Sequence, residues 1–392
     1  MTVDGNIIFS FLFFTSLLLF LHSYFFYPVS IWFAALLFKK QYRVSENYRP
    51  HVSVLISAFN EEKVIEKTIR ILEGSDYPRE KIEIVVGSDN SSDSTDAIVQ
   101  KLSLEFENIK LISFNQRRGK SQVINDIAER ASGEILVFSD ANTIYDKSAM
   151  KNLVKYFEDS RVGGVSGKLK LLDYETSKYS GSQEKKYWDV ETWLKEQEGY
   201  LGILIGANGG IYCIRREHFE KIPTDRPVMD DFFISLMVLR KRKDFLYIKN
   251  AFAEEYAAPT IQAEFYRKVR NNSIMMSTIN VIKDILNPAF GLRAYALWSH
   301  KIIRWFSPVL LIILFTSNLF LLWESDYFKS LLIIQCGFYI IALIGHLLLK
   351  INFNIVPILL CHYFVMTNIA MLIGLIKFVF NKHTAFWQST PR

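Results

Sequence analysis

Long apolar stretches at the two ends of the chain constrain its fold more than any other feature. Half of the 392 residues are hydrophobic, 31 of them are Phe, and the excess lies outside a polar middle region at about 39–301. A membrane-spanning helix needs roughly 20 mainly apolar residues. Stretch 7–38 is long enough for one tilted or kinked helix, and three further stretches lie at 306–323, 331–349 and 355–380. We therefore expect an integral membrane protein with a polar domain between its membrane segments.

Basic residues beside these stretches predict how the chain is oriented. Lys39, Lys40 and Arg43 follow the first stretch at once, whereas its N-terminal flank carries only Asp4. Positive charge beside a spanning helix favours the cytoplasmic side. We expect the N-terminus outside and the middle region in the cytosol. Four spans would leave the basic C-terminal tail outside as well, against the same rule, so either one segment is re-entrant or the first stretch makes two passes.

Charge and cysteine content narrow the possible functions. The net charge is +6, and basic residues gather at 240–243 and 267–270, where they suit anionic lipid headgroups or phosphorylated substrates. The sequence contains no dense Lys/Arg tract and no nucleic-acid motif, so nucleic acid is not an expected partner. The three cysteines form neither a metal-spaced pair nor a disulfide framework, as in a reducing compartment. The apolar stretches hold few ionisable residues, which argues against a transporter.

The middle region alternates short apolar runs with helical patterns. Runs at 52–59, 82–86, 109–114 and 134–138 are mainly apolar and predict strands, and the last of them, without polar alternation, is typical of a strand buried on both faces. The segments between them repeat apolar residues at helical spacing. Strands and helices that alternate over such short intervals predict an α/β domain with a parallel sheet and helices on both faces.

Polar residues follow the ends of these predicted strands. Asp89 follows the second, Asp140 follows the fourth with Asn142 two residues later, and Lys120 opens the helix before the fourth. Open α/β sheets bind ligands at the carboxyl ends of their strands, and a carboxylate with a nearby Asn can hold a hard divalent cation against a phosphate. Each residue alone is also typical of a cap or turn. Together they predict a nucleotide-diphosphate site.

Two later segments carry further candidates. Gly209 lies in a glycine-rich turn before the apolar run 211–216, and it either permits close approach to a ligand or only makes the turn. Asp230 and Asp231 open a helix. The helix dipole favours acidic residues at this position, which is the structural interpretation, whereas the functional interpretation makes one of them a general base. The segment 187–204 has a helical pattern that suits an interfacial helix or a plain surface helix.

Five segments, in this order, resemble the motifs of membrane-embedded family 2 glycosyltransferases related to cellulose, hyaluronan and poly-N-acetylglucosamine synthases. Segment 57–61 (Ser-Ala-Phe-Asn-Glu) resembles the first nucleotide-binding segment, and Asp89 with Asp93 and Thr95 resembles the Asp-Gly-Ser-Thr-Asp-Gly-Thr turn. The other three are similar to the Asp-x-Asp, Thr-Glu-Asp and Gln-x-x-Arg-Trp motifs, and they lie at 140–142, 229–231 and 301–305. The resemblance covers nearly the whole chain and implies a Rossmann-like GT-A fold.

This resemblance implies domain boundaries and a location. We expect an N-terminal transmembrane segment at 1–40, a cytoplasmic GT-A domain at 41–285, an interfacial segment with the Arg-Trp motif at 286–305, and about three transmembrane helices with a tail at 306–392. The protein would lie in the cytoplasmic membrane, in contact with its lipids, with the catalytic domain in the cytosol. The sequence does not indicate an oligomeric state.

The resemblance also assigns the donor site. Ala58, Asn60 and Glu61 would contact the nucleotide of the donor, and Asp89 would hydrogen-bond its uracil or other base. Lys120 would lie near the diphosphate. These roles imply a nucleotide-sugar donor, most simply a UDP-sugar. In addition, Asp140 and Asn142 would help to hold Mg²⁺ or Mn²⁺ on the diphosphate.

The remaining motifs imply the chemistry of transfer. Asp231 would deprotonate the acceptor hydroxyl, and Asp230 beside it would raise its pKa. Arg304 would steady the leaving diphosphate, because a diphosphate leaving group needs electrostatic stabilisation. Trp305 would stack on the acceptor sugar, with Asp230 and Gly209 also on the acceptor side. The family resemblance implies inversion at the anomeric carbon.

We therefore expect an inverting glycosyltransferase that extends a growing polysaccharide or a lipid-linked glycan. Two alternatives stay open: a transferase that makes a single addition, and a catalytically weak scaffold subunit of a polysaccharide assembly complex. Asn142 replaces the second Asp of Asp-x-Asp and Lys301 replaces Gln, which favours the scaffold. Asp231, Arg304 and Trp305 argue against it, because a scaffold need not retain all three.

Overall fold

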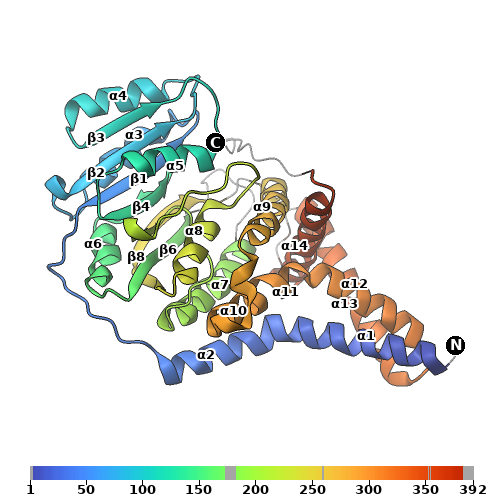
Figure 1. Cartoon of the computed structure of the whole chain (residues 1–392). Coiled ribbons are helices and arrows are strands. Elements are labelled where there is room, and N and C mark those ends of the chain that lie inside the picture. Colours follow the sequence, from blue (N-terminus) through green and yellow to red (C-terminus); the bar gives the residue numbers. More distant parts are fainter. Residues whose placement is uncertain (1–2, 173–181, 258–259, 352, 354, 383–392) are drawn as a thin grey trace.

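The computed structural model contains an α/β domain from which a group of long apolar helices extends (Figure 1). It describes residues 3–172, 182–257, 260–351, 353 and 355–382. Arg392, one of the tail residues that bear on the predicted orientation, lies outside the described residues.

A mixed sheet of eight strands, in the order β3-β2-β1-β4-β7-β6-β8-β5, forms the centre of the domain. The half containing β1–β4 is parallel, as the sequence predicts. In the other half β7 runs antiparallel to β4 and β6, and β5 runs antiparallel to β8, while β6 and β8 are parallel. The strands are β1 Val52–Ala58, β2 Ile82–Ser88, β3 Ile109–Ser113, β4 Ile135–Asp140, β5 Ile144–Tyr145, β6 Val162–Leu172, β7 Tyr212–Arg215 and β8 Asp244–Tyr256.

Helices cover both faces of the sheet, and each face has its own hydrophobic core. One core joins α2 (Tyr27–Phe38), α5 and α8 to the sheet through residues such as Ile31, Val123 and Phe232. The other joins α3, α4 and α6 through residues such as Ile69 and Val99. The helices of the domain are α3 Ile65–Glu73, α4 Thr95–Glu105, α5 Lys120–Arg130, α6 Ala149–Val154, α7 Ser182–Tyr200, α8 Asp230–Arg240 and α9 Ile261–Val281.

The register of the parallel strands brings their carboxyl ends to one edge. Ser57 pairs with Gly87 on one side and with Asp140 on the other. Close packing at the opposite end depends on Gly133, where a Cβ atom would lie 2.5 Å from the backbone nitrogen of Ser53. Polar residues that follow β1, β2 and β4 therefore meet at a single edge of the sheet.

The first apolar stretch forms one helical run rather than two passes. Helix α1 Val3–Leu21 continues through a π-helical turn, His22–Phe26, into α2 Tyr27–Phe38. Together they make one candidate membrane span of 34 residues, Gly5–Phe38. In Figure 1 α2 lies below the domain, where it packs against α7, and α1 extends away from the domain beside α12.

The C-terminal region forms two helices long enough to span a membrane and one bent pair. Helices α13 Asp326–Lys350 and α14 Val356–Val379 have the necessary length and apolarity. Helix α12 Ser307–Leu321 has only 15 residues and meets the helical segment Leu292–Trp305 at 61°. By length and composition, the described residues thus hold three candidate spans, or four if the bent pair counts as one.

The predicted span at 306–323 is therefore shorter than expected. A proline stands in the first turn of α12, where it is compatible with a helix start but not with an unbroken helix from the preceding segment. That segment comprises α10 Leu292–Ala296, the π-helical turn Leu297–Ile302 and α11 Ile303–Trp305.

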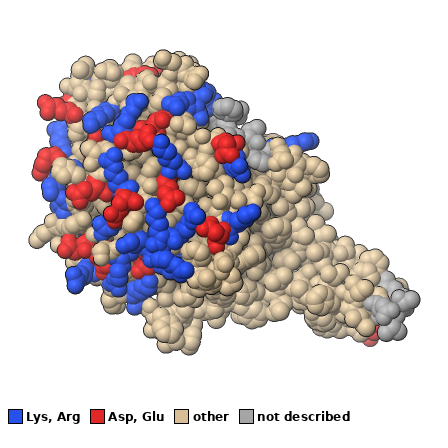
Figure 2. Space-filling model, in the orientation of Figure 1, with Lys and Arg blue, Asp and Glu red and all other residues tan. Residues whose placement is uncertain are grey.

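Figure 2 shows Lys and Arg side chains gathered on the domain, while the visible surface of the long helices is almost free of charge.

Candidate active site

A pocket of about 450 Å³ lies at the carboxyl edge of the parallel strands. Residues after β1, β2 and β4 line one side of it, and residues of α7, α8 and α9 line other parts. The wall that faces the membrane helices contains Trp305 of α11 and Met371 of α14. The pocket thus connects the predicted nucleotide edge of the sheet with the candidate membrane helices.

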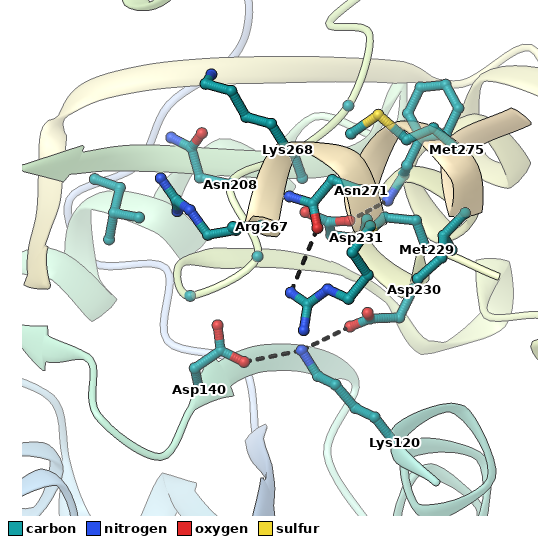
Figure 3. Close-up of a pocket in the computed structure, with 18 of the residues that line it drawn as sticks. Lys120, Asp140, Asn208, Met229, Asp230, Asp231, Arg267, Lys268, Asn271 and Met275 are labelled. Atoms are coloured by element: carbon teal, nitrogen blue, oxygen red, sulfur yellow. Dashed lines mark hydrogen bonds and ion pairs between the residues drawn. The ribbon is translucent and has the colours of Figure 1, made fainter. Parts of the chain in front are cut away.

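Lys120 bridges two carboxylates in this pocket. Its Nζ lies 2.9 Å from Oδ1 of Asp140 and 3.1 Å from Oδ2 of Asp230 (Figure 3). Burial alone would lower the pKa of Lys120, but Asp140 and Asp230 outweigh it and raise the pKa above its usual value. The ammonium group therefore stays charged and offsets the repulsion between the carboxylates.

Asp231 is a carboxylate whose pKa lies well above the usual value for an aspartate. Burial and the neighbouring Asp230 raise the pKa of Asp231 to about 7, against the opposing effect of Lys120 and Lys195. Its Oδ1 accepts a hydrogen bond of 2.7 Å from the backbone N–H of Phe232. A carboxylate with this pKa can take up a proton near neutral pH, as a general base must.

Gly209 lies directly against this carboxylate. A Cβ atom at residue 209 would lie 3.2 Å from Oδ2 of Asp231 and 3.8 Å from Oδ2 of Asp140. A side chain would therefore narrow the space between these two acidic residues. The structure brings together the predicted residues Asp140, Gly209, Asp230 and Asp231 around Lys120.

Asp89 lies at the predicted strand end, where it holds a loop. Its two carboxylate oxygens accept hydrogen bonds from the backbone N–H groups of Arg118 and Gly119, at 2.6 and 3.0 Å. The guanidinium of Arg117 lies 3.6 Å from the ring centroid of Phe59, and both residues line the pocket. Contact between Asp89 and a base stays a prediction, while the geometry gives Asp89 a role in shaping the loop before α5.

Only one of the three residues predicted from segment 57–61 borders the pocket. Glu61 is among the lining residues, whereas Ala58 and Asn60 are not. Ala58 is buried within β1, and the Oδ1 of Asn60 accepts a hydrogen bond from the N–H of Ser92. Neither Ala58 nor Asn60 borders the pocket, and their direct contact with a donor stays a prediction.

Asp140 and Asn142 lie beside a further carboxylate that the sequence did not indicate. The amide nitrogen of Asn142 donates to Oε1 of Glu255 at 3.1 Å, and all three residues line the pocket. Among the described residues no group of three or more His, Cys, Asp or Glu side chains is arranged to hold a metal ion. Oxygen atoms from carboxylates and amides are nevertheless the ligands that Mg²⁺ and Mn²⁺ prefer.

Helix α9 brings basic side chains to the pocket. Arg267 and Lys268 form ion pairs with Glu264, at 2.5 and 3.2 Å, whereas Arg270 has no carboxylate at ion-pair distance among the described residues. Burial and Arg267 lower the pKa of Arg270, and the more distant Asp230 acts in the opposite sense. A half-buried guanidinium without a carboxylate partner is well suited to bind an oxyanion.

Arg304 and Lys301 converge on one carboxylate at the membrane side. Lys301 Nζ and Arg304 Nη1 lie 2.8 and 3.1 Å from the oxygens of Glu191. The buried ring of His300 lies between Glu191 and Glu198, at 3.0 and 2.6 Å. Burial favours protonation of Glu191, but His300 and Lys301 reverse this effect and hold its pKa well below the usual value.

Trp305 also lies at the membrane side of the pocket, but it is largely buried. Only 6% of the residue is exposed, and its ring lies edge-on to Phe232 at 5.6 Å between centroids. Arg304 also donates to the backbone carbonyl of Ser23, at 3.4 Å. The Arg-Trp pair therefore joins the domain to the first candidate membrane span, and stacking of Trp305 on a sugar stays a prediction.

Several pocket residues were not predicted as site residues. Arg270 belongs to the basic cluster 267–270, which the sequence associated with phosphate or lipid without placing it at the site. Glu191 and Lys195 lie on α7, which the sequence indicated only as an interfacial or surface helix. In the structure this helix packs between α2 and β8, with both residues largely buried. Charged residues within an otherwise helical pattern were the available signal.

Comparison with known proteins agrees with this geometry. Residues 53–222 match the family model described as glycosyl transferase family 2. The chain contains a family 2 glycosyltransferase domain. It is 30% identical over 200 residues to the probable glycosyltransferase YdaM of Bacillus subtilis, a match that covers 48% of this chain and 46% of YdaM. It is 28% identical over 173 residues to the beta-monoglucosyldiacylglycerol synthase of Trichormus variabilis, covering 44% and 37%.

A third relative is the poly-beta-1,6-N-acetyl-D-glucosamine synthase of Staphylococcus aureus, 28% identical over 181 residues, which cover 44% of this chain and 43% of the synthase. The matches to these three relatives thus span less than half of each relative's own length. Among solved structures, the mannosyltransferase PcManGT from Pyrobaculum calidifontis, in complex with GDP-Man and Mn²⁺, superposes with a TM-score of 0.69 at 19% identity, over 97% of this chain and 99% of that one. The predicted GT-A fold is confirmed.

Proposed function

We propose that this protein is an inverting glycosyltransferase that moves a sugar from a nucleotide-sugar donor to an acceptor held at the membrane. One observation carries the proposal. Asp231, whose pKa is raised to about 7, lines the same pocket as Asp140 and Lys120. A base, a candidate metal ligand and a phosphate-binding cation thus share one cavity, and Lys120 and Asp140 lie within the region that matches the family 2 model.

The donor diphosphate would bind beside Lys120. Asp140 and Asn142, with Glu255 next to them, would hold Mg²⁺ or Mn²⁺, and the phosphates would complete its oxygen ligands. The metal would act as a Lewis acid that stabilises the leaving diphosphate. The solved PcManGT structure holds GDP-Man and Mn²⁺, which supports a nucleotide sugar and a divalent metal as a class. A UDP-sugar remains the prediction for this chain.

We assign to Arg270 the diphosphate contact that the sequence resemblance assigned to Arg304. Arg304 belongs to the group of cations at the other end of the pocket, where it pairs with Glu191 and donates to the Ser23 carbonyl. Arg270 lines the pocket without a carboxylate partner among the described residues, and Asp140 and Asp230 favour its charged form. Its guanidinium is therefore available for the negative charge that grows on the leaving group.

Asp231 would act on the acceptor. Its carboxylate accepts the proton of the acceptor hydroxyl while the oxygen bonds to the anomeric carbon and the bond to the diphosphate oxygen breaks. The nucleotide leaves with the electron pair, and attack from the opposite face inverts the anomeric carbon, as in family 2 enzymes. Gly209 leaves room beside Asp231 for the incoming oxygen.

The acceptor would be a membrane-held glycan or lipid, approached from the cytosol. Candidate spans flank the domain, and α14 contributes Thr367 and Met371 to the pocket wall. The proposed orientation rests on Lys39 and Lys40, which follow the first span. Two relatives carry names of a glycolipid synthase and a polysaccharide synthase, and both classes of acceptor suit a pocket that adjoins the membrane.

Nucleotide release by the purified full-length protein tests this function. A panel of UDP- and GDP-sugars would be supplied with Mn²⁺ or Mg²⁺ and with lipids of the native membrane. We expect release from one donor, and loss of release in Asp231→Asn with nucleotide binding retained. No release from any donor, or equal release by Asp231→Asn, would contradict the proposal.

A further inference from the structure

The pocket has a second group of cations on the membrane side of Asp231, in addition to those on the donor side. Three cations of this group, Lys195, Lys301 and Arg304, line the pocket together with one carboxylate, Glu191. Among the side chains that line this end, three cations thus face one carboxylate, while Glu198 lies behind His300 and does not line the pocket. The donor diphosphate belongs at the other end, next to Lys120, so the excess calls for a second anion.

Lys195 is the member of this group that the protein itself leaves least compensated. It is 6% exposed, and its Nζ donates to Oδ1 of Asn208 at 2.7 Å. No carboxylate lies within ion-pair distance of it among the described residues. Burial and Lys301 lower the pKa of Lys195 to about 8, and Glu191 and Asp231 act in the opposite sense. A bound anion would offset the free-energy cost of this buried charge.

Lys195 also has the right position to orient a substrate. Its partner Asn208 is itself fixed, because its amide nitrogen donates to the Gly167 carbonyl and its backbone N–H donates to Ser166. Gly209, the next residue, lies against Asp231. An anion on Lys195 would therefore be held close to the proposed base.

The wall next to this group is apolar and belongs partly to a membrane helix. Met275 of α9 and Met371 of α14 line it, together with Thr367 and Trp305. Helices α9 and α14 lie side by side (Figure 1). Gly374 of α14 permits this close packing, because a Cβ atom there would lie 3.0 Å from the Asn272 side chain of α9. A ligand that filled both the cationic end and the space along this apolar wall would carry a negative charge next to an apolar chain.

We propose that the membrane-side end of the pocket binds the phosphate of an anionic lipid acceptor through Lys195, Lys301 and Arg304. The inference rests on the proposed glycosyltransferase function and names the class of its acceptor. The hydroxyl that receives the sugar would lie at Asp231, the phosphate at Lys195, and the lipid chain against Met371 and the neighbouring apolar wall. Glu191 holds Lys301 and Arg304 in position for this contact.

Lipid binding to the purified full-length protein in a neutral detergent tests the proposal. The probes are phosphatidic acid and diacylglycerol with identical acyl chains, with inorganic phosphate as the free anion. Lys195→Met keeps the apolar stem and removes the charge, and Lys195→Arg restores it. Lys221→Met is the control, because Lys221 is an exposed lysine that pairs with Glu129 outside the pocket.

We expect the wild type to bind phosphatidic acid more tightly than diacylglycerol. Lys195→Met should weaken phosphatidic acid binding about 10-fold or more, the usual effect of losing a hydrogen bond to a charged group. Lys195→Arg should recover most of this loss, and Lys221→Met should bind like the wild type. Lys301→Met provides a second test and should show the same selective loss if Lys195→Met fails to fold.

Equal binding of the two lipids, or an equal loss of both in Lys195→Met, would overturn the phosphate subsite. Inorganic phosphate that binds as tightly as phosphatidic acid would overturn the lipid as its source. Nucleotide release from donor sugars is measured separately on the wild type. Its absence would contradict the proposed function whatever the lipid result, and its presence without selective lipid binding would contradict only this inference.

Discussion

Lowering the pH should slow the enzyme in a way that identifies its base. The pKa of Asp231 is raised to about 7, whereas an ordinary Asp has a value of 3.8. With a pKa of about 7, the ionised fraction is roughly 90% at pH 8 and roughly 10% at pH 6, since each pH unit below the pKa lowers it about tenfold. An ordinary Asp stays almost fully ionised over this range. We therefore expect kcat/KM for donor hydrolysis to fall by about tenfold from pH 8 to pH 6.

The fall of kcat/KM at low pH is the acid limb of the pH profile. Two substitutions should shift the pH of this limb in opposite directions. Asp230→Asn removes the carboxylate that helps raise the pKa of Asp231, so the limb should move to lower pH. Lys195→Met removes a cation that favours the ionised form of Asp231, so the limb should move to higher pH. The assay is nucleotide release at limiting donor with water as the acceptor. Equal rates at pH 6 and pH 8, or unchanged profiles in both variants, would refute Asp231 as the base.

Three further predictions concern the metal, the leaving group and the fold. A chelator should abolish nucleotide release and Mn²⁺ or Mg²⁺ should restore it, while Asp140→Ala should raise the metal concentration needed. Arg270→Met should lower kcat for donor hydrolysis by about 10²–10³-fold, as loss of a charge-stabilising donor does, and clearly more than Arg304→Met; the reverse order would return the role to Arg304. Gly133→Ala should lower the free energy of unfolding by about 1–3 kcal/mol, because the added Cβ would overlap the Ser53 backbone. Gly337→Ala is the control and should leave the free energy of unfolding unchanged, because its added Cβ would lie in open space, and thermal unfolding compares the two variants.

Much of the fold followed from local patterns. The four runs that became β1–β4 are mainly apolar. Strands β1, β2 and β4 are buried on both faces, whereas β3 lies at the edge of the sheet with Lys110 exposed. The mixed half of the sheet did not follow, because β6 and β8 contain charged residues such as Lys168 and Glu254 and pair with partners far apart in sequence. The chain bends between the helical segment Leu292–Trp305 and α12, which has a proline in its first turn. This bend makes the span expected at 306–323 shorter than its apolar stretch indicates.

The site was predictable where residues act at strand ends and less so where distant helices meet. Asp140 and Asp231 lie in the pocket because strand and helix termini converge at one edge of the sheet. Arg270 reaches the same pocket only because α9 packs along α14, which no local pattern indicates. Arg304 matched a sequence motif, yet tertiary contacts direct its guanidinium to Glu191.

The most direct test of the account follows the sugar itself. Purified protein in vesicles of its native lipids would receive a donor labelled in the sugar, and the label in the lipid fraction would be compared with the nucleotide released. We predict one labelled lipid product for each nucleotide released in excess of hydrolysis, and none with Asp231→Asn. Failure to transfer label from any donor, or transfer that persists in Asp231→Asn, would contradict the claim that this pocket performs sugar transfer.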